Sequence, residues 1–600
     1  MIKLPAFFSD GMVISKKAKI WGWGEPGQKI DVAFLNKKYE TVVDNSGRFD
    51  VVVESENYGG AYSMTIGDVV LSDVHVGRVW LCGGQSNMEG SIERAKPLVA
   101  EYVVDDSRIR MFQVEKGLNF DAPATDVVGE WHVAAGEIMD GLYAVPYFFA
   151  RQLLMDDETP VGLICMPAGG TPMQGWLPED AVLEFPDYYS ELFPLKESEY
   201  VKNIVETDEK RIKKWHDKVS ENDSGLAEHW HSPTYDDSTW ESKVILDSTG
   251  FPEHGVVWLR KSIDLPANVS GKVTLNLGRA ENSVQVFVNG KRVCEVDYMY
   301  PPCRCTLPDD LLKAGKNLIA VRLVGDANHP QFVPGKNYSL VHAHGQVDLN
   351  DGWKWRVGAV MPKCDASTWF YGYPCGVYNH MLAPVLGYSA DGMIWYQGES
   401  NTKNPFDYKA LFTQFVQHVR EYYGEDFPII FNQLANYIEP SGNWEGWTFL
   451  REQQRKCLNI PNTAMSVSID CGEWNDLHPM DKKTVGERLA LHARRLAYRE
   501  NIVSDGPIAV GAELKDKELT IYFENATGLW AKGGHPIVEI IDGVGNVRRV
   551  YAAVKGETLF VNLSRHKIDE KIIRFGWTDC PSVTLYNAYN LPASPFEIKI

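Results

Sequence analysis

The first 75 residues alternate between apolar and polar positions over short stretches. Residues 30–34 (IDVAF) show the two-residue period of a half-buried strand, and residues 19–24 (KIWGWG) form a second such stretch. Turn residues separate these stretches at positions 25–27 (EPG) and 44–47 (DNSG). Because short alternating strands broken by Gly, Pro and Asn are typical of antiparallel sandwiches, we predict an amino-terminal β-sandwich over residues 1–75.

From residue 77 the apolar runs become continuous. Residues 77–82 (GRVWLC) and 161–165 (VGLIC) have the composition of strands buried on both faces, and residues 147–154 between them have a helical pattern. The same pattern returns with a strand at residues 393–396 (MIWY) and a helical run at 483–499. Apolar strands that alternate with helices indicate a parallel sheet covered on both faces.

A long β-rich insertion interrupts this pattern. Residues 196–220 are charged and helical in period, and the stretch from about 225 to 360 consists of alternating strands with a hairpin signal at Asn289-Gly290. Strands return after residue 506. The chain is therefore predicted to be an α/β protein in five segments: a β-sandwich at 1–75, the α/β domain at 76–205 and 363–505, an inserted jelly-roll sandwich at 206–362, and a carboxyl-terminal sandwich at 506–600.

Composition narrows the classes of partner. A formal charge of −20 argues against nucleic acid and anionic membranes, which attract basic surfaces. No run of about 18 apolar residues is present, so we expect no transmembrane helix. The 18 Trp and 27 Tyr suit a carbohydrate binder, because aromatic faces stack on sugar rings, although most of them also suit a core. The sequence does not indicate an oligomeric state.

The sequence indicates neither a secretion signal nor a metal site. Residues 1–5 (MIKLP) lack a basic segment followed by an apolar stretch, so a chain that begins here is expected in the cytoplasm. The ten cysteines are scattered, and Cys303 and Cys305 have no second pair to complete a zinc site. We therefore expect reduced thiols, no metal and no cofactor.

Ser86 is the first candidate for chemistry. It follows the strand at residues 77–82 and two glycines, and it opens the segment QSNM, without the Gly-x-Ser-x-Gly elbow of α/β-hydrolases. A serine placed there exposes its hydroxyl at the carboxyl end of the sheet, where open α/β folds bind ligands. A serine after glycine is more often only a helix cap, so this position alone does not decide the matter.

Three more polar segments follow strands or precede helices of the same domain. They are residues 167–172 (PAGGTP), 395–401 (WYQGESN) and 476–479 (DLHP). The first offers backbone N–H groups for a substrate oxygen, and the last offers an Asp and a His in one loop. Each alone is ordinary loop sequence, but four such segments at the strand ends of one sheet favour an active site.

Together these residues resemble the sialate O-acetylesterase family of the SGNH (GDSL-type) hydrolase superfamily. The resemblance covers nearly the whole chain, and its segments are residues 8–13, 84–89, 169–172 with Trp176, 395–401, 476–482 and 591–596. It implies an SGNH-type three-layer α/β/α domain with flanking and inserted β-sandwiches. It also implies a serine esterase that removes acetyl groups from sugar hydroxyls. The inserted segment resembles the galactose-binding-like sandwiches of glycoside-processing enzymes, and we expect it to act as a scaffold or lid.

By this resemblance Ser86 is the nucleophile and His478 the base. The backbone N–H groups of Ser86 and Gly170 and the amide of Gln397 are the implied oxyanion donors. The remaining implied substrate-binding residues are Asn87, Trp176 and Asn401. The expected ligand is a sugar or oligosaccharide that carries acetyl esters.

The acid that orients His478 is open between two residues. The superfamily places an Asp three positions before the His, but Asn475 stands there and Asp476 lies two before. Related sugar acetylesterases use a Glu that corresponds to Glu399. We favour Asp476.

Two other functions are compatible with the sequence. One is an esterase for acetylated xylan or mannan oligosaccharides, which has the same chemistry. The other is a catalytically silent carbohydrate-binding protein, which the complete set of catalytic residues disfavours.

Overall fold

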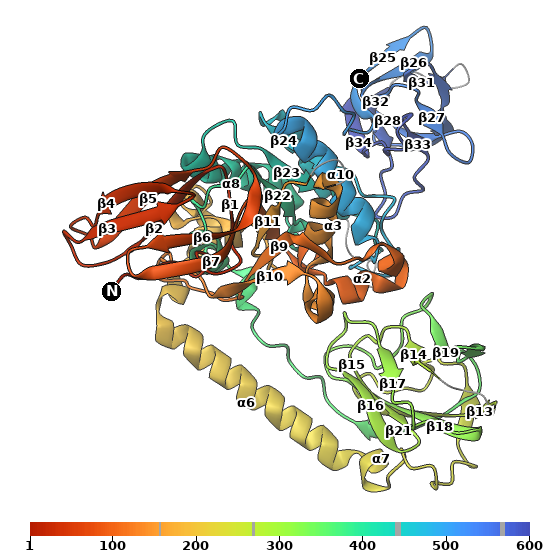
Figure 1. Cartoon of the computed structure of the whole chain (residues 1–600). Helices are drawn as coiled ribbons and strands as arrows, with labels where there is room; N and C mark the ends of the chain where they lie inside the picture. The colour runs from red at the N-terminus through yellow and green to blue at the C-terminus, as the bar shows by residue number, and fades with distance from the viewer. Residues whose placement is uncertain (155–157, 267–270, 439–445, 564–569) are drawn as a thin grey trace. The chain divides into compact units, whose positions relative to one another are not determined.

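The computed structural model describes residues 1–154, 158–266, 271–438, 446–563 and 570–600 (Figure 1). Its contacts divide the chain into two compact units. The first consists of Met1–Glu197 and Trp369–Ile600, and the second, Ser198–Thr368, is inserted into it. The inserted unit starts a few residues before the predicted boundary at 206 because a long helix precedes its first strand.

A seven-stranded sheet in the order β10-β9-β11-β8-β22-β23-β24 forms the centre of the first unit. Six of its strands are parallel and β10 is antiparallel to β9. All residues of β11, β22 and β23 are buried, which accounts for their continuous apolar runs and confirms the predicted parallel sheet. The strands are β8 (Arg78–Gly84), β9 (Asp106–Val114), β10 (Gly129–Ala134), β11 (Val161–Cys165), β22 (Gly392–Tyr396), β23 (Ile429–Asn432) and β24 (Thr463–Ser466).

Helices cover both faces of this sheet. On one face α3 and α10 lie side by side and pack on Ile394 and Tyr396 (Figure 1). On the other face the rings of Phe415 and Phe412 of α8 contact Trp395 and Phe431. The helices are α1 (Ser86–Glu89), α2 (Ile92–Val99), α3 (Ala144–Leu153), α4 (Glu179–Val182), α5 (Pro186–Leu192), α8 (Tyr408–Tyr423), α9 (Gly446–Lys456) and α10 (Lys482–Leu496).

The amino-terminal strands form two sheets, which are antiparallel, as the alternating pattern predicts, except that β1 pairs with β7 in parallel. One sheet has the order β1-β7-β6-β3-β4, and β2 pairs with β5 in the other. An aromatic cluster of Phe7, Phe8 and Trp21 packs against Tyr388 of the α/β domain. The strands are β1 (Val13–Ile14), β2 (Lys17–Trp23), β3 (Lys29–Phe34), β4 (Lys37–Val42), β5 (Arg48–Glu54), β6 (Gly59–Ile66) and β7 (Val69–Val76).

The carboxyl-terminal strands form three small antiparallel sheets, ordered β25-β26-β31-β30, β27-β33 and β29-β28-β32-β34. The fully buried guanidinium of Arg451 in α9 ties them to the α/β domain, because it donates to the carbonyls of Thr578 and Asp579 at 3.0 and 2.9 Å. The strands are β25 (Ile508–Lys515), β26 (Glu518–Glu524), β27 (Trp530–Ala531), β28 (Ile537–Asp542), β29 (Val547–Tyr551), β30 (Ala553–Lys555), β31 (Thr558–Asn562), β32 (Glu570–Phe575), β33 (Leu585–Tyr586) and β34 (Phe596–Lys599).

The inserted unit joins two helices to two antiparallel sheets, ordered β12-β21-β13-β18-β15-β16 and β17-β14-β19-β20. The apolar faces of the sheets enclose one core. Asn289 and Gly290 both have positive φ and turn β15 into β16, as the hairpin signal predicts. The elements are α6 (Ser198–Asn222), α7 (Ser224–Ala227), β12 (Glu241–Lys243), β13 (Gly255–Leu265), β14 (Val273–Leu277), β15 (Ser283–Val288), β16 (Lys291–Val296), β17 (Arg304–Leu307), β18 (Gly315–Gly325), β19 (Tyr338–His342), β20 (Gly345–Asp348) and β21 (Trp353–Val360).

The prediction that the cysteines are reduced is wrong for two of them. Cys294 in β16 and Cys305 in β17 form a disulfide, with 5.8 Å between their Cα atoms. The strands bring together residues 11 positions apart in the sequence, and the spacing of cysteines alone does not reveal such a pairing. The other described cysteines are free thiols. Among the described helices none is long and apolar enough to cross a membrane.

Candidate active site

The loops after three neighbouring strands are joined at the carboxyl edge of the parallel sheet. The N–H of Gln85 donates to the Tyr396 carbonyl at 2.9 Å, and the N–H of Ala168 donates to the Gly84 carbonyl at 3.0 Å. Gly84 has φ +132°, and a Cβ there would lie 2.2 Å from the Tyr396 oxygen. Only glycine therefore fits where β8 ends, and it lets the chain turn directly into α1.

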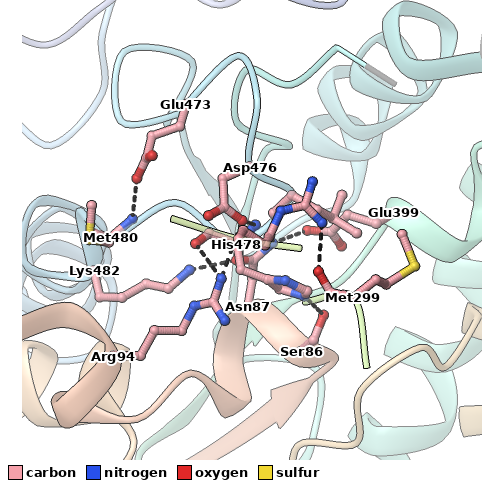
Figure 2. Close-up of polar contacts among 12 residues, drawn as sticks. Ser86, Asn87, Arg94, Met299, Glu399, Glu473, Asp476, His478, Met480 and Lys482 are labelled. Carbon is pink, nitrogen blue, oxygen red and sulfur yellow. Dashed lines mark hydrogen bonds and ion pairs between the residues drawn. The ribbon is translucent and has the colours of Figure 1, made fainter. Parts of the chain in front are cut away.

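Ser86 at the start of α1 contacts a histidine from a distant loop. Ser86 Oγ and His478 Nε2 are 2.7 Å apart (Figure 2). His478 is only 8% exposed and lies in the loop that precedes α10. In this arrangement an imidazole can accept the hydroxyl proton as the oxygen attacks a carbonyl carbon.

Asp476 and Arg94 hold the loop that carries the histidine. Asp476 Oδ1 accepts a hydrogen bond from the backbone N–H of His478 at 2.9 Å and a second from Arg94 Nη2 at 3.2 Å. The same Arg94 nitrogen lies 3.3 Å from the His478 carbonyl oxygen. The ion pair is largely buried, because its side chains are 17% and 11% exposed. These contacts fix the position of the His478 backbone, from which the imidazole side chain extends.

Glu399, the other candidate acid, is buried beside Asn87. Its Oε1 accepts a hydrogen bond from Asn87 Nδ2 at 2.5 Å, and the same nitrogen donates to the Leu477 carbonyl at 3.0 Å. Glu399 Oε2 is buried without a hydrogen-bond partner among the residues that the structure describes. Burial raises the pKa of Glu399, and the hydrogen bond from Asn87 opposes this shift. Asn87 thus connects Glu399 to the residue next to His478.

Lys482 completes this buried polar cluster. Its Nζ donates to Asn87 Oδ1 at 2.5 Å, and the residue is 2% exposed. Burial lowers the pKa of Lys482 to about 7; the charge of Arg94 lowers it as well, whereas Glu399 raises it. Asn87 therefore lies between an acid and an amine whose charged forms are both disfavoured by burial.

The loop after β11 lies directly against Ser86. Glu89 Oε2 accepts a hydrogen bond from the Gly169 N–H at 2.8 Å, and Glu89 Oε1 pairs with Lys116 at 2.7 Å. A Cβ on Gly169 would lie 3.4 Å from Ser86 Cβ. Gly170, the predicted oxyanion donor, follows with φ +72°. Glu89 is therefore the side chain that anchors this loop beside the nucleophile.

Gln397 is placed differently from its predicted role. Its amide nitrogen donates to the Thr171 carbonyl at 3.1 Å and to Asn401 Oδ1 at 2.7 Å, and the residue is fully buried. Because a primary amide has two N–H groups, both are engaged in joining loops, and neither points to an oxyanion in this arrangement.

The implied substrate-binding residues also lie within the wall of the site. Asn401 is 2% exposed and its Oδ1 accepts a hydrogen bond from the Met173 N–H at 2.8 Å. Trp176 is fully buried, and its indole nitrogen donates to Thr171 Oγ1 at 2.9 Å. Asn87 is 1% exposed. All three support the loops that carry Ser86 and Gly170.

Several residues of the site were not singled out from the sequence. The sequence contained a signal for Lys482, because the helix dipole disfavours a lysine at the first position of α10, and such a lysine indicates a polar partner nearby. Arg94 and Glu89 carried none, because one charged residue on a short helix is usually solvated. In the described ranges the one group of residues with metal-ligand spacing is Cys294, Cys303 and Cys305 of the inserted unit, but the disulfide between Cys294 and Cys305 leaves only Cys303 as a thiol.

Comparisons with known proteins find family matches for two parts of the chain. A family model described as carbohydrate esterase, sialic acid-specific acetylesterase matches residues 76–207 and 365–495. A model described as beta-galactosidase second all-beta domain matches residues 226–327. The two parts of the first match are the halves of the α/β domain, and the second lies within the inserted unit.

Individual relatives and a solved structure are also similar to the chain. A sialate O-acetylesterase of Mus musculus is 23% identical over 562 residues, which cover 85% of this chain and 76% of the relative. The Homo sapiens enzyme of that name is 31% identical over 158 residues, or 23% of this chain and 30% of the relative. The crystal structure of a carbohydrate acetylesterase from Xanthomonas citri aligns over 100% of this chain and 99% of its own, with a TM-score of 0.65 and 22% identity. The α/β domain of this chain therefore belongs to the sialic acid-specific acetylesterase family of carbohydrate esterases.

Proposed function

We propose that this esterase removes acetyl groups from sugar hydroxyls through an acetyl-enzyme on Ser86. The observation that carries the proposal is the 2.7 Å contact between Ser86 Oγ and His478 Nε2 at the carboxyl edge of the parallel sheet. The contact joins residues 392 positions apart, so the fold and not local sequence creates it. The sheet and its helices are those of an SGNH-type three-layer α/β/α domain.

The reaction follows from this geometry in two halves. Ser86 Oγ attacks the acetyl carbonyl carbon while His478 Nε2 takes the hydroxyl proton. The ester C–O bond then breaks, and His478 returns the proton to the departing sugar oxygen. In the second half His478 deprotonates a water that attacks the acetyl-enzyme, and acetate leaves as Ser86 regains its proton. Asp476 orients His478 in this scheme, and Glu399 is the alternative.

The negative charge on the carbonyl oxygen needs donors near Ser86. The backbone N–H groups of Ser86 and Gly170 are the proposed donors, since the Gly169–Gly170 loop contacts Ser86. Gln397 contributes by holding Thr171 and Asn401 in place. One oxyanion donor is worth about two to three orders of magnitude in turnover.

An acyl-enzyme is directly testable. Mixing the protein with p-nitrophenyl acetate should release a burst of p-nitrophenol close to one equivalent of enzyme, followed by slower turnover, and Ser86→Ala should abolish both phases. An unaltered burst in Ser86→Ala, with the fold confirmed by circular dichroism, would exclude Ser86 as the nucleophile. Absence of any ester hydrolysis in the unmodified protein would support the binding-protein alternative instead.

The natural substrate is proposed to be an O-acetylated sialic acid, because a relative that aligns over 85% of the chain is named a sialate O-acetylesterase. Acetylated xylan or mannan oligosaccharides are the second candidate. Acetate release from O-acetylated sialic acid, acetylated xylan and acetylated mannan, compared at equal ester concentration, decides between them. A kcat/KM at least tenfold higher for either polysaccharide would overturn the sialate assignment.

The inserted unit is proposed to be a galactose-binding-like jelly roll with a scaffold role. Its two antiparallel sheets around one core and its match to an all-β domain of beta-galactosidase support this assignment.

A further inference from the structure

One tryptophan that contacts the loop beside the nucleophile is exposed, whereas two other tryptophans of the site are buried. Trp369 is 55% exposed, while Trp176 and Trp395 are fully buried. Exposure of a large aromatic side chain leaves apolar surface in water. The position of this ring is nevertheless fixed, which distinguishes it from a loose surface residue.

Two contacts hold the indole of Trp369. Its Nε1 donates to the Gly170 carbonyl at 3.3 Å. The ring of Tyr371 lies against it, with 5.2 Å between centroids and 33° between planes. A Cβ on Gly170 would come within 2.8 Å of the indole nitrogen, so the glycine makes room for the ring. The indole is therefore oriented before any ligand arrives.

The same loop joins the indole to the nucleophile. The Gly170 carbonyl accepts the indole N–H of Trp369, and a Cβ on the preceding Gly169 would lie 3.4 Å from Ser86 Cβ. Successive Cα atoms are only about 3.8 Å apart. An ester whose carbonyl carbon lies at Ser86 Oγ therefore has its alcohol part within reach of the indole.

We infer that Trp369, with Tyr371 behind it, is a platform on which the pyranose ring that carries the acetyl group stacks. This inference rests on the proposed function, because it assumes an ester attacked by Ser86. Pyranose rings present apolar C–H faces, and a flat, exposed and pre-oriented aromatic surface binds such a face with little loss of conformational entropy. The platform contacts the sugar ring, and the oxyanion donors contact the carbonyl oxygen of the acetyl group.

The test compares two esters that share the acetyl group. One is a mono-O-acetylated methyl pyranoside and the other is ethyl acetate, whose alcohol has no ring. For Trp369→Ala, the ratio of kcat/KM for the pyranoside to kcat/KM for ethyl acetate should fall about tenfold, mainly through KM. Trp369→Phe keeps an aromatic face without the N–H and should retain most of the ratio.

The matched control is Trp530→Ala in the carboxyl-terminal sheets. Trp530 is 38% exposed, its indole nitrogen donates to the Asn587 carbonyl at 2.9 Å, and its ring stacks on Tyr586. Trp530→Ala should leave the ratio unchanged.

Three outcomes contradict the platform. Equal losses of kcat/KM for both esters in Trp369→Ala would assign the indole to loop positioning. An unchanged kcat/KM for both esters would remove it from recognition, and a ratio lost equally in Trp369→Phe would assign the effect to the N–H. Failure of the proposed function is separate, because then Ser86→Ala would hydrolyse both esters as well as the unmodified protein does.

Discussion

Asp476→Asn is the substitution that most directly tests the acid of the proposed mechanism. It preserves the size of the side chain and removes its charge. In the structure Asp476 Oδ1 accepts hydrogen bonds from the His478 N–H at 2.9 Å and from Arg94 at 3.2 Å. The substitution therefore weakens the anchor of the His478 loop and, in the proposed mechanism, removes the negative charge that stabilises the imidazolium.

The two effects differ in size. A hydrogen bond to a charged group contributes about 1.5–3 kcal/mol. Loss of the loop anchor alone therefore predicts a fall in kcat of roughly tenfold to a hundredfold. Removal of the acid of a triad costs roughly four orders of magnitude. We expect Asp476→Asn to lower kcat by about three orders or more, which only the second effect explains.

Glu399→Gln is the matched comparison. Its amide oxygen can still accept the hydrogen bond from Asn87. The amide also keeps the size of the buried carboxyl, so the packing around the side chain is preserved. We therefore expect a loss in kcat of less than about a hundredfold, in the range of a perturbed hydrogen bond to a charged group.

The assay is the steady-state rate and the burst with p-nitrophenyl acetate for both variants, with melting temperatures to separate folding from catalysis. The reasoning is refuted if Glu399→Gln is far more damaging than Asp476→Asn at equal stability. Glu399 would then be the acid that orients His478.

Three further substitutions test the supporting structure. Glu89→Ala removes the acceptor of the Gly169 N–H and should lower kcat for ethyl acetate roughly tenfold with little change in KM; a change in KM alone would contradict an oxyanion-loop role. Lys482→Met removes the buried amine, whose pKa in the folded protein is about 7, below its value in the unfolded chain. As pH rises above 7, the folded protein loses this proton while the unfolded chain keeps it, so the free energy of unfolding increases with pH. In urea unfolding, the free energy of unfolding of the unmodified protein should increase by on the order of 3 kcal/mol relative to that of Lys482→Met between pH 7 and 9.5. A difference between the two proteins that does not change with pH would refute this. Gly84→Ala places a Cβ 2.2 Å from the Tyr396 oxygen at positive φ and should destabilise the fold by about 3 kcal/mol or more; a melting temperature within 2 °C (about 1 kcal/mol) would contradict this packing argument.

The sequence by itself determined the elements and their order. Continuous apolar runs marked β11 and β22 as strands buried on both faces, and alternating runs marked the sandwich strands, because side-chain periodicity follows directly from backbone geometry. Since parallel strands end at one edge, the order of elements also placed Ser86 and the loop of His478 at a common site. The resemblance to acetylesterases then assigned their roles.

The tertiary structure decided which polar groups meet. The family resemblance implied ligand contacts for Gln397 and Asn401, whereas the packing of loops directs the Gln397 amide to Asn401 and Thr171. Lys482 and Asn87, 395 positions apart, meet only because α10 packs on α3 and on the β23–β24 side of the sheet. Hydrogen bonds between distant loops depend on side-chain directions set by the whole core, and no local period encodes them. The disulfide between Cys294 and Cys305 follows the same rule, because two strands must pack before their thiols are close enough to bond.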